Sequence, residues 1–154
     1  MAFTLTSTGF ADGGSLPDAQ VHARDNRSPQ LSWSGAPAGT KSFAVTCYDP
    51  DAPTGSGFWH WTVANIPADV IELAEGATVP AGAVEGRTDF GVPGFGGAAP
   101  PKGHGPHRYI FTVFAVDAER LDVTPENSGA VFGFNLHFHT LAKASIMGVY
   151  ENRG

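Results

Sequence analysis

Two short polar segments stand beside prolines and glycines at the ends of apolar runs. The first is Asp49-Pro50-Asp51-Ala52-Pro53, and the second is Gly103-His104-Gly105-Pro106-His107-Arg108-Tyr109. Proline fixes φ, so the two carboxylates of the first segment have little entropy left to lose on binding. Alternation along a strand sends His107 and Tyr109 to one face and Arg108 to the other. One face therefore offers an imidazole and a phenol together, next to possible acid–base partners.

A third segment, Phe58–Asn65, carries His60 between two tryptophans where a core strand would normally hold a hydrophobe. A lone histidine in such a place is more often a satisfied core residue than a ligand. An isolated Asp-Pro-Asp is likewise more often an ordinary turn. Asp49, however, has the parity of the apolar side chains of its strand, so its carboxylate needs partners. We interpret the three segments as walls of one pocket.

Alternating and apolar runs predict strands over 3–8, 31–33, 42–49, 59–65, 107–116 and 145–150. The runs 59–65 and 107–116 are apolar on both parities, as expected for central strands covered on both faces. Thr124-Pro125-Glu126 predicts the start of a helix that continues to about Lys143. The long segment Gly86–Pro106 is rich in glycine and proline, and loops of this length are usually functional or disordered.

The chain of 154 residues fits one domain, residues 1–154, with enough length for a proper core. Its net charge of −6 disfavours nonspecific binding to nucleic acids or to anionic membranes. Cys47 is the single cysteine, so no internal disulfide forms and a reducing compartment is compatible. The first residues lack the features of a signal peptide, and no apolar run has membrane-spanning length. We therefore expect a cytoplasmic protein.

Together with Pro100-Pro101-Lys102-Gly103, these motifs resemble the phosphatidylethanolamine-binding protein family, also called Raf-kinase-inhibitor-like proteins, and in particular its compact bacterial branch. The resemblance covers roughly Phe3 to Glu151. It implies a mostly β fold in which a large central sheet packs against a smaller sheet, with a C-terminal helix. It also implies a pocket for a small anion, such as the phosphate of a phospholipid headgroup or of a phosphorylated residue.

The resemblance implies the following ligand-binding residues: Asp49, Asp51, His60, Pro100, Pro101, His107 and Tyr109. We expect His60 and His107 to donate hydrogen bonds to the anion, with the Tyr109 hydroxyl as a further donor. Asp49 would fix a histidine tautomer and favour its protonated form, and Asp51 could receive a ligand ammonium. We expect Arg108 to be a buried structural residue paired with Asp49 or Asp51. The glycines of Gly94-Phe95-Gly96-Gly97 would let the backbone approach the anion closely.

Two other functions stay open. The family offers precedent for a protein-interaction inhibitor of a kinase or protease, and Asp49 with His107 could serve a small phosphoester hydrolase. Neither a nucleophile motif nor a paired base for a serine or cysteine is present, so we do not expect an enzyme. The chain also lacks a nucleotide-binding P-loop.

We expect no metal and no cofactor. His137 and His139 lie two apart on the predicted helix and cannot share a face, and no His-x-His strand motif joins His60, His104 and His107. Many compact bacterial members look like homodimers, which implies a possible homodimer here. Because the chain ends Tyr150-Glu151-Asn152-Arg153-Gly154, we expect it to lack the mammalian-type C-terminal extension that helps to cover the site.

Overall fold

The computed structural model describes residues 2–154; Met1, which the predicted domain includes, lies outside the described residues. The strands are β1 (Thr4–Thr6), β2 (Gly14–Ser15), β3 (Leu31–Ser34), β4 (Ser42–Asp49), β5 (Phe58–Pro67), β6 (Glu72–Leu73), β7 (Val84–Glu85), β8 (His107–Val116) and β9 (Thr140–Tyr150). The α-helix is α1 (Gly129–His139), and Asp18–Gln20 form one 3₁₀ turn. Within these residues, no helix is long and apolar enough to cross a lipid bilayer.

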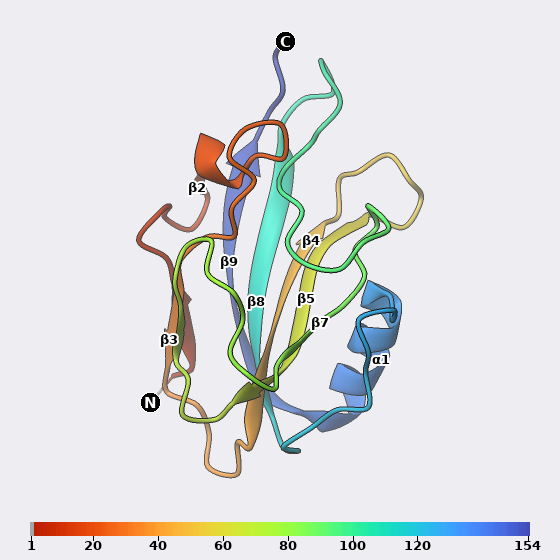
Figure 1. The fold of residues 1–154 in the computed structure, drawn as a ribbon. Helices are drawn as coiled ribbons and strands as arrows, with labels where there is room; N and C mark the ends of the chain where they lie inside the picture. The colour runs from red at the N-terminus through yellow and green to blue at the C-terminus, as the bar shows by residue number, and fades with distance from the viewer. Residues whose placement is uncertain (1) are drawn as a thin grey trace.

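The strands form two sheets. The main sheet has six strands in the order β2-β9-β8-β4-β5-β7, and the small sheet has three in the order β1-β3-β6. The main sheet stands in the middle of the molecule, with β3 and its neighbours on one side and α1 on the other (Figure 1). This arrangement confirms the predicted fold class, a large sheet packed against a smaller one with a C-terminal helix.

Apolar clusters lie on both faces of the main sheet. Between the two sheets, Trp33 and Phe43 from opposite sheets pack with the fully buried Phe111 of β8. On the other face, Phe132 and Leu136 of α1 pack against the end of β8. The two clusters explain why β5 and β8 are apolar on both parities, as central strands must be when both faces are covered.

The predicted helix is wrong at both ends. It begins at Gly129, where the Ser128 hydroxyl accepts a hydrogen bond from the Val131 N–H, while Thr124–Asn127 form a separate turn. It ends at His139 because the following residues pair with β8, as in the register Ala142↔Ala115. Sheet pairing thus overrides a sequence pattern that reads equally well as helix.

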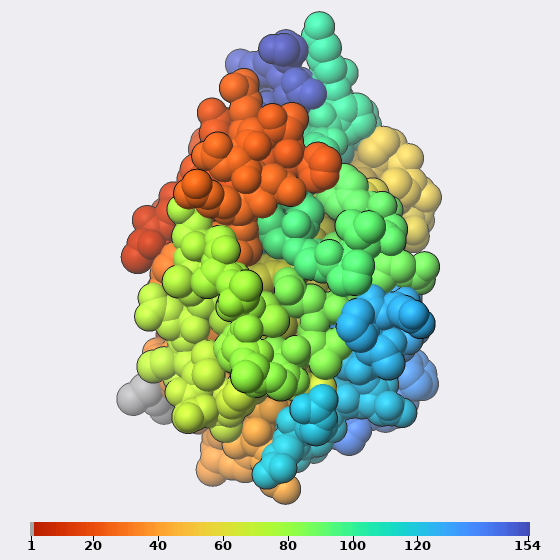
Figure 2. Space-filling view, viewed as in Figure 1, coloured from red at the N-terminus to blue at the C-terminus, as the bar shows by residue number. Residues whose placement is uncertain are grey.

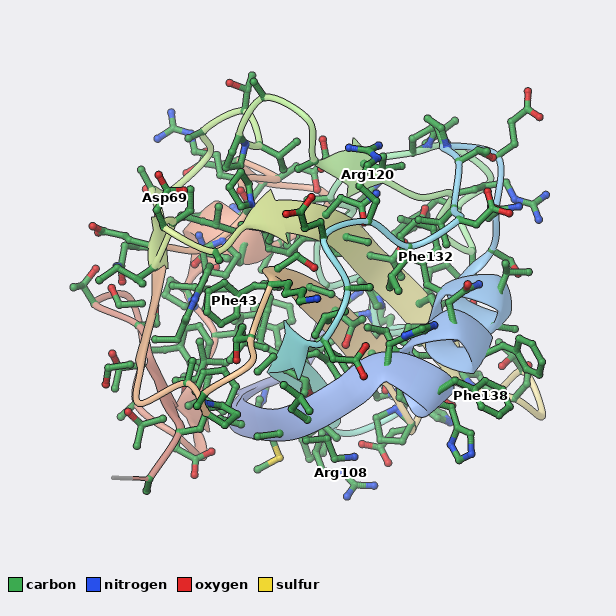
Figure 3. The ribbon with its side chains drawn as sticks, turned by 90° about the horizontal axis from the view of Figure 1, so that it is seen from below. Phe43, Asp69, Arg108, Arg120, Phe132 and Phe138 are labelled. Carbon is green, nitrogen blue, oxygen red and sulfur yellow. The ribbon has the colours of Figure 1, made fainter. Side chains whose placement is uncertain are left out.

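The buried and exposed phenylalanines of α1 give a matched pair for testing the core. Phe132 is fully buried between α1 and the sheet, whereas Phe138 lies on the outer side of the helix (Figure 3). Phe134 is likewise 68% exposed. We predict that Phe132→Ala lowers the free energy of unfolding by about 3–5 kcal/mol, because it leaves a cavity in the core. At a protein concentration low enough to keep the chain monomeric, Phe134→Ala should change it by no more than about 0.5 kcal/mol. Equal losses in urea denaturation would contradict this assignment of the core.

Candidate functional site

Three antiparallel strands bring the polar segments together at one end of the main sheet. β4 ends at Asp49, and its neighbour β8 begins at His107. On the other side of β4, β5 runs antiparallel with Phe58 opposite Asp49, so His60 lies near the same end. Residues far apart in the sequence therefore meet because antiparallel neighbours alternate their beginnings and ends.

A cavity of about 240 Å³ opens at this end. Its polar wall residues are Asp49, Thr54, His60, His107 and Tyr109, and its apolar ones are Ala52, Pro53, Phe58, Phe90, Ala99 and Pro101. One water takes up about 30 Å³ in the liquid, so the cavity has room for a small polyatomic ligand. Five of the predicted residues, Asp49, His60, Pro101, His107 and Tyr109, line it, whereas Asp51 and Pro100 do not.

The buried pair Asp49–His107 forms the floor of the site. The His107 Nδ1–H donates to Asp49 Oδ2 over 2.7 Å, and both side chains are at most 3% exposed. The other carboxylate oxygen, Oδ1, accepts the Asp51 N–H at 2.7 Å, which is the turn geometry expected of an aspartate before a proline. Asp49 is thus both a turn residue and a site residue. It fixes the His107 tautomer, leaving Nε2 as the imidazole nitrogen that faces other partners.

His60 is held in a neutral state. Its Nδ1 lies 2.8 Å from the Gly96 carbonyl oxygen, and because a carbonyl only accepts, Nδ1 carries the proton. Burial lowers the pKa of His60, an effect that the nearby Gly96 carbonyl and the Asp49 charge only partly offset. Neutral His60 therefore presents a lone pair at Nε2. It can donate to an anion only after it has taken up a proton.

Tyr109 has an unpartnered hydroxyl at the cavity. The residue is 1% exposed, and its hydroxyl oxygen has no hydrogen-bond partner among the described residues. The Ala99 backbone approaches it without meeting hydrogen-bonding geometry. Burial, together with the Asp49 charge, raises the pKa of Tyr109, so the phenol keeps its proton. A buried hydroxyl left unpaired costs about 1–3 kcal/mol, so this one calls for an explanation.

His104 is a residue of the site that the sequence analysis considered only as a metal ligand. Its Nδ1 lies 2.6 Å from Nε2 of His107, so it occupies the nitrogen that Asp49 leaves free. The spacing of three residues across Gly105-Pro106 was the signal that could have revealed this contact. No group of three or more His, Cys, Asp or Glu within residues 2–154 is arranged to hold a metal ion.

The expected burial of Arg108 is wrong, while its expected carboxylate partner is correct. The side chain is 51% exposed and points away from the sheet (Figure 3). Its Nε and Nη2 donate to the two oxygens of Asp51 at 3.0 and 2.8 Å, and its backbone N–H donates to the same carboxylate. Helix α1 covers the other end of this face, which leaves the Arg108 end uncovered. Because Asp51 is engaged by Arg108, it is not a free acceptor for a ligand ammonium.

The glycine run before the site packs against the protein itself. A Cβ on Gly97 would lie 2.3 Å from the Gln20 carbonyl oxygen, and one on Gly96 would lie 2.4 Å from the Phe90 ring. The Gly97 N–H donates to the Asn26 side chain. The expectation that this run approaches an anion is therefore wrong: these glycines allow close packing, and the Gly96 carbonyl orients His60.

Pro100 lies in a second hollow next to the cavity. This hollow shares Ala99 with the cavity and is lined by the segments 21–24, 98–100 and 150–154. Figure 2 shows the segment around residues 20–25, the loop around residues 100–105 and the C-terminal residues gathered at the same end of the molecule. The hollow includes Arg24 and Arg153, and Lys102 packs against Gly154. Basic side chains therefore lie beside this neighbouring hollow, where Glu151 pairs with Arg153, although the chain carries a net charge of −6.

A large sheet between a smaller sheet and a helix, with an acid–imidazole–phenol cavity at its strand ends, defines a class of β-rich domains. The chain belongs to the phosphatidylethanolamine-binding protein family, whose model matches residues 6–151. It is 54% identical over 157 residues to UPF0098 protein YbhB of Escherichia coli, covering 96% of this chain and 99% of that protein.

Solved structures have the same fold. The crystal structure of E. coli YbcL, described as a member of the mammalian PEBP family, superposes with a TM-score of 0.95 at 50% identity, covering 98% of this chain and 99% of that one. A carboxypeptidase Y inhibitor, solved in complex with its cognate proteinase, superposes with a TM-score of 0.58 at 21% identity, covering 97% and 83% of the two chains. At that identity the likeness concerns the fold alone.

The Asp51–Arg108 pair gives a prediction about acid titration. The side-chain hydrogen bonds from Arg108 lower the pKa of Asp51 to about 2. We predict that Arg108→Gln raises this pKa toward the ordinary value of about 3.9, measured by NMR of the Asp51 carboxyl carbon. A depressed carboxyl pKa stabilises the fold above the unfolded-state value, and this contribution is lost as the pH falls toward 2. The variant should therefore lose less stability than the wild type over that acid range. An unchanged Asp51 titration would contradict the assigned cause.

Proposed function

We propose that this chain binds a small anion, the phosphate of a lipid headgroup or of a phosphorylated residue, in the cavity between Asp49, His60, His107 and Tyr109. The observation that carries this proposal is the Tyr109 hydroxyl, a protonated donor that is buried at the cavity without a partner. A phosphate oxygen would satisfy it. Buried polar groups in native proteins are nearly always paired, and a ligand is one way in which such a group becomes paired.

The charges around the cavity favour anion binding only if the imidazoles of the site take up protons. Asp49 already places one negative charge at the floor, and His107 offsets it when it is protonated. His60 is neutral and becomes a donor only in its protonated form. Anion binding is therefore coupled to proton uptake by these imidazoles. The basic side chains of Arg24 and Lys102, at the hollow next to the cavity, favour the approach of an anion to this end.

The two alternatives have weaker support. An inhibitor of a protease or kinase has only the fold likeness to the carboxypeptidase Y inhibitor behind it, at 21% identity. A phosphoester hydrolase would need a nucleophile or an activated water. His107, the one candidate base beside Asp49, has both imidazole nitrogens engaged. Turnover of a phosphoester that is lost in a His107 variant would favour the hydrolase over the binding protein.

Sulfate tests the anion proposal because its charge does not change near neutral pH. Burial holds the pKa of His60 below the ordinary histidine value of about 6.5, so sulfate binding should strengthen as the pH is lowered from about 8 to about 6 and below. For each proton taken up, the affinity should rise by at most about tenfold per pH unit. We predict that calorimetric titrations of the wild-type protein follow this direction. Competition by glycerophosphoethanolamine or by a phosphoserine peptide then distinguishes the two sources of phosphate.

Variants assign this binding to the cavity. His107→Asn keeps a donor toward Asp49 and removes the titrating ring, so it should weaken sulfate binding and flatten the pH dependence. Tyr109→Phe removes only the unpartnered hydroxyl, so it should weaken binding without loss of stability. His137→Ala, on the exposed side of α1, is the control and should change neither quantity. Sulfate affinity that is independent of pH and equal in all three variants would refute the proposed site.

We also propose that the chain forms a homodimer through α1. Val131, Phe134 and Phe138 of α1 are 39–68% exposed and follow one another at helical spacing, and the exposed Leu141 lies next to them at the start of β9. Phe134 packs edge-on against Phe138 at 5.2 Å. Exposed apolar patches of this kind often mark protein–protein contacts. We predict a dimer in sedimentation equilibrium at micromolar concentration, converted to monomer by Phe134→Ser together with Phe138→Ser. A wild-type protein that sediments only as a monomer would refute this.

A further inference from the structure

The contact between His104 and His107 blocks the nitrogen that an anion would need. Asp49 holds Nδ1 of His107, so Nε2 is the position from which His107 can donate to a ligand. In the structure His104 Nδ1 lies 2.6 Å from that Nε2, with the two ring centroids 4.9 Å apart. His104 itself is exposed and is not part of the cavity wall. A ligand and His104 therefore compete for one hydrogen-bonding position.

The contact allows only one proton between the two rings. With Nδ1–H of His107 directed to Asp49, either His104 Nδ1 or His107 Nε2 carries the proton that joins them. The imidazole pair can then be neutral or carry one positive charge. If both rings are cationic, two N–H groups face each other and the hydrogen bond is lost. A second proton therefore removes His104 from His107 and leaves His107 as a cationic donor.

The loop that carries His104 is suited to this movement. Gly103 and Gly105 flank it with φ values of 76° and 89°, in the left-handed region that glycine adopts readily. A Cβ placed on either glycine would meet nothing within 4 Å, so no side chain packs over these two positions. Two backbone hydrogen bonds hold the loop: the Gly103 N–H donates to the Asn152 carbonyl at 3.0 Å, and the His104 N–H donates to the Pro101 carbonyl at 3.1 Å. The exposed His104 side chain can rotate away from His107 while the backbone on both sides stays in place.

We propose that His104 is a proton-controlled gate of the anion site: it occupies His107 Nε2 while the pair carries at most one positive charge, and it leaves when both rings are protonated. This proposal rests on the proposed anion binding and adds its regulation. An anion binds the open form, so it shifts the population away from the closed contact. The gate sharpens the pH dependence of binding, because one proton makes His107 a donor and another removes His104.

Other charged groups lie around the His104–His107 pair, and a test of the gate must leave their charges unchanged or control for them. Lys102 precedes His104 on the same loop, and Asp49 lies behind His107. Asp51 is paired with Arg108 on β8, and Glu151 is paired with Arg153 on the C-terminal segment. Lys102→Ala is therefore the matched control. It removes a charge from the gate loop without touching the His104–His107 contact.

The test compares sulfate titrations of wild type, His104→Ala and Lys102→Ala in the presence of a chelator, so that no adventitious metal bridges the imidazoles. At about pH 8, His104→Ala should bind sulfate about fivefold more tightly than wild type, the factor that corresponds to one hydrogen bond of about 1 kcal/mol. At about pH 6 the difference should shrink, because protons open the gate in the wild type as well. Lys102→Ala should bind more weakly at both pH values, as the loss of a positive charge requires.

If His104→Ala binds sulfate at about pH 8 no more tightly than the wild type, the gate is overturned. If it binds more weakly than the wild type, His104 is a direct ligand of the anion instead. If the wild type binds no sulfate at either pH, the proposed anion site is refuted. The gate is then tested on the free protein, without a ligand. Imidazole ¹⁵N NMR of the free protein then follows His107 Nε2. Its signal should differ between wild type and His104→Ala at high pH and converge at low pH. Identical signals throughout would overturn the gate.

Discussion

The site depends on the buried hydrogen bond between Asp49 and His107. It joins the last residue of β4 to the first residue of β8, so it fixes the two strand ends between which the cavity opens. A buried carboxylate is costly unless its oxygens are satisfied, and here the His107 ring and the Asp51 N–H satisfy them. The same bond sets the His107 tautomer. Removing either partner would leave the other buried and unpaired, which makes this contact both structural and functional.

The sequence predicted the central strands well because their signal is local. The bounds of β4 and β8 match the expected ranges 42–49 and 107–116, and the parity argument correctly placed Asp49 on the buried side. The helix could not be placed as well, because the residues after His139 satisfy both a helical and a strand pattern. Their pairing with β8 decides between the two, and pairing is a long-range property.

The sequence predicted the site residues that belong to family motifs. It did not predict those features of the site that depend on which elements pack nearby. Asp49, His60, His107 and Tyr109 line one cavity as expected. The exposure of Arg108 depends on which part of the sheet α1 covers, and the sequence of β8 does not encode that. The contact of His104 with His107 depends on the turn at Gly105-Pro106. The spacing of three residues from His107 is compatible with this contact, but a histidine in an exposed loop gives no periodic signal, so the three-dimensional arrangement was needed to establish its partner.

Burial determines which side chains of the cavity carry protons. Tyr109 keeps its proton because burial raises its pKa, and His60 is kept neutral because burial lowers its pKa. Both shifts follow from the same low-dielectric surroundings, which disfavour any charge that has no partner. Apart from the Asp49–His107 pair at its floor, the cavity therefore has no charged side chain in its wall. An anion that enters must bring or draw in protons, and the imidazoles at the strand ends are the groups that can accept them.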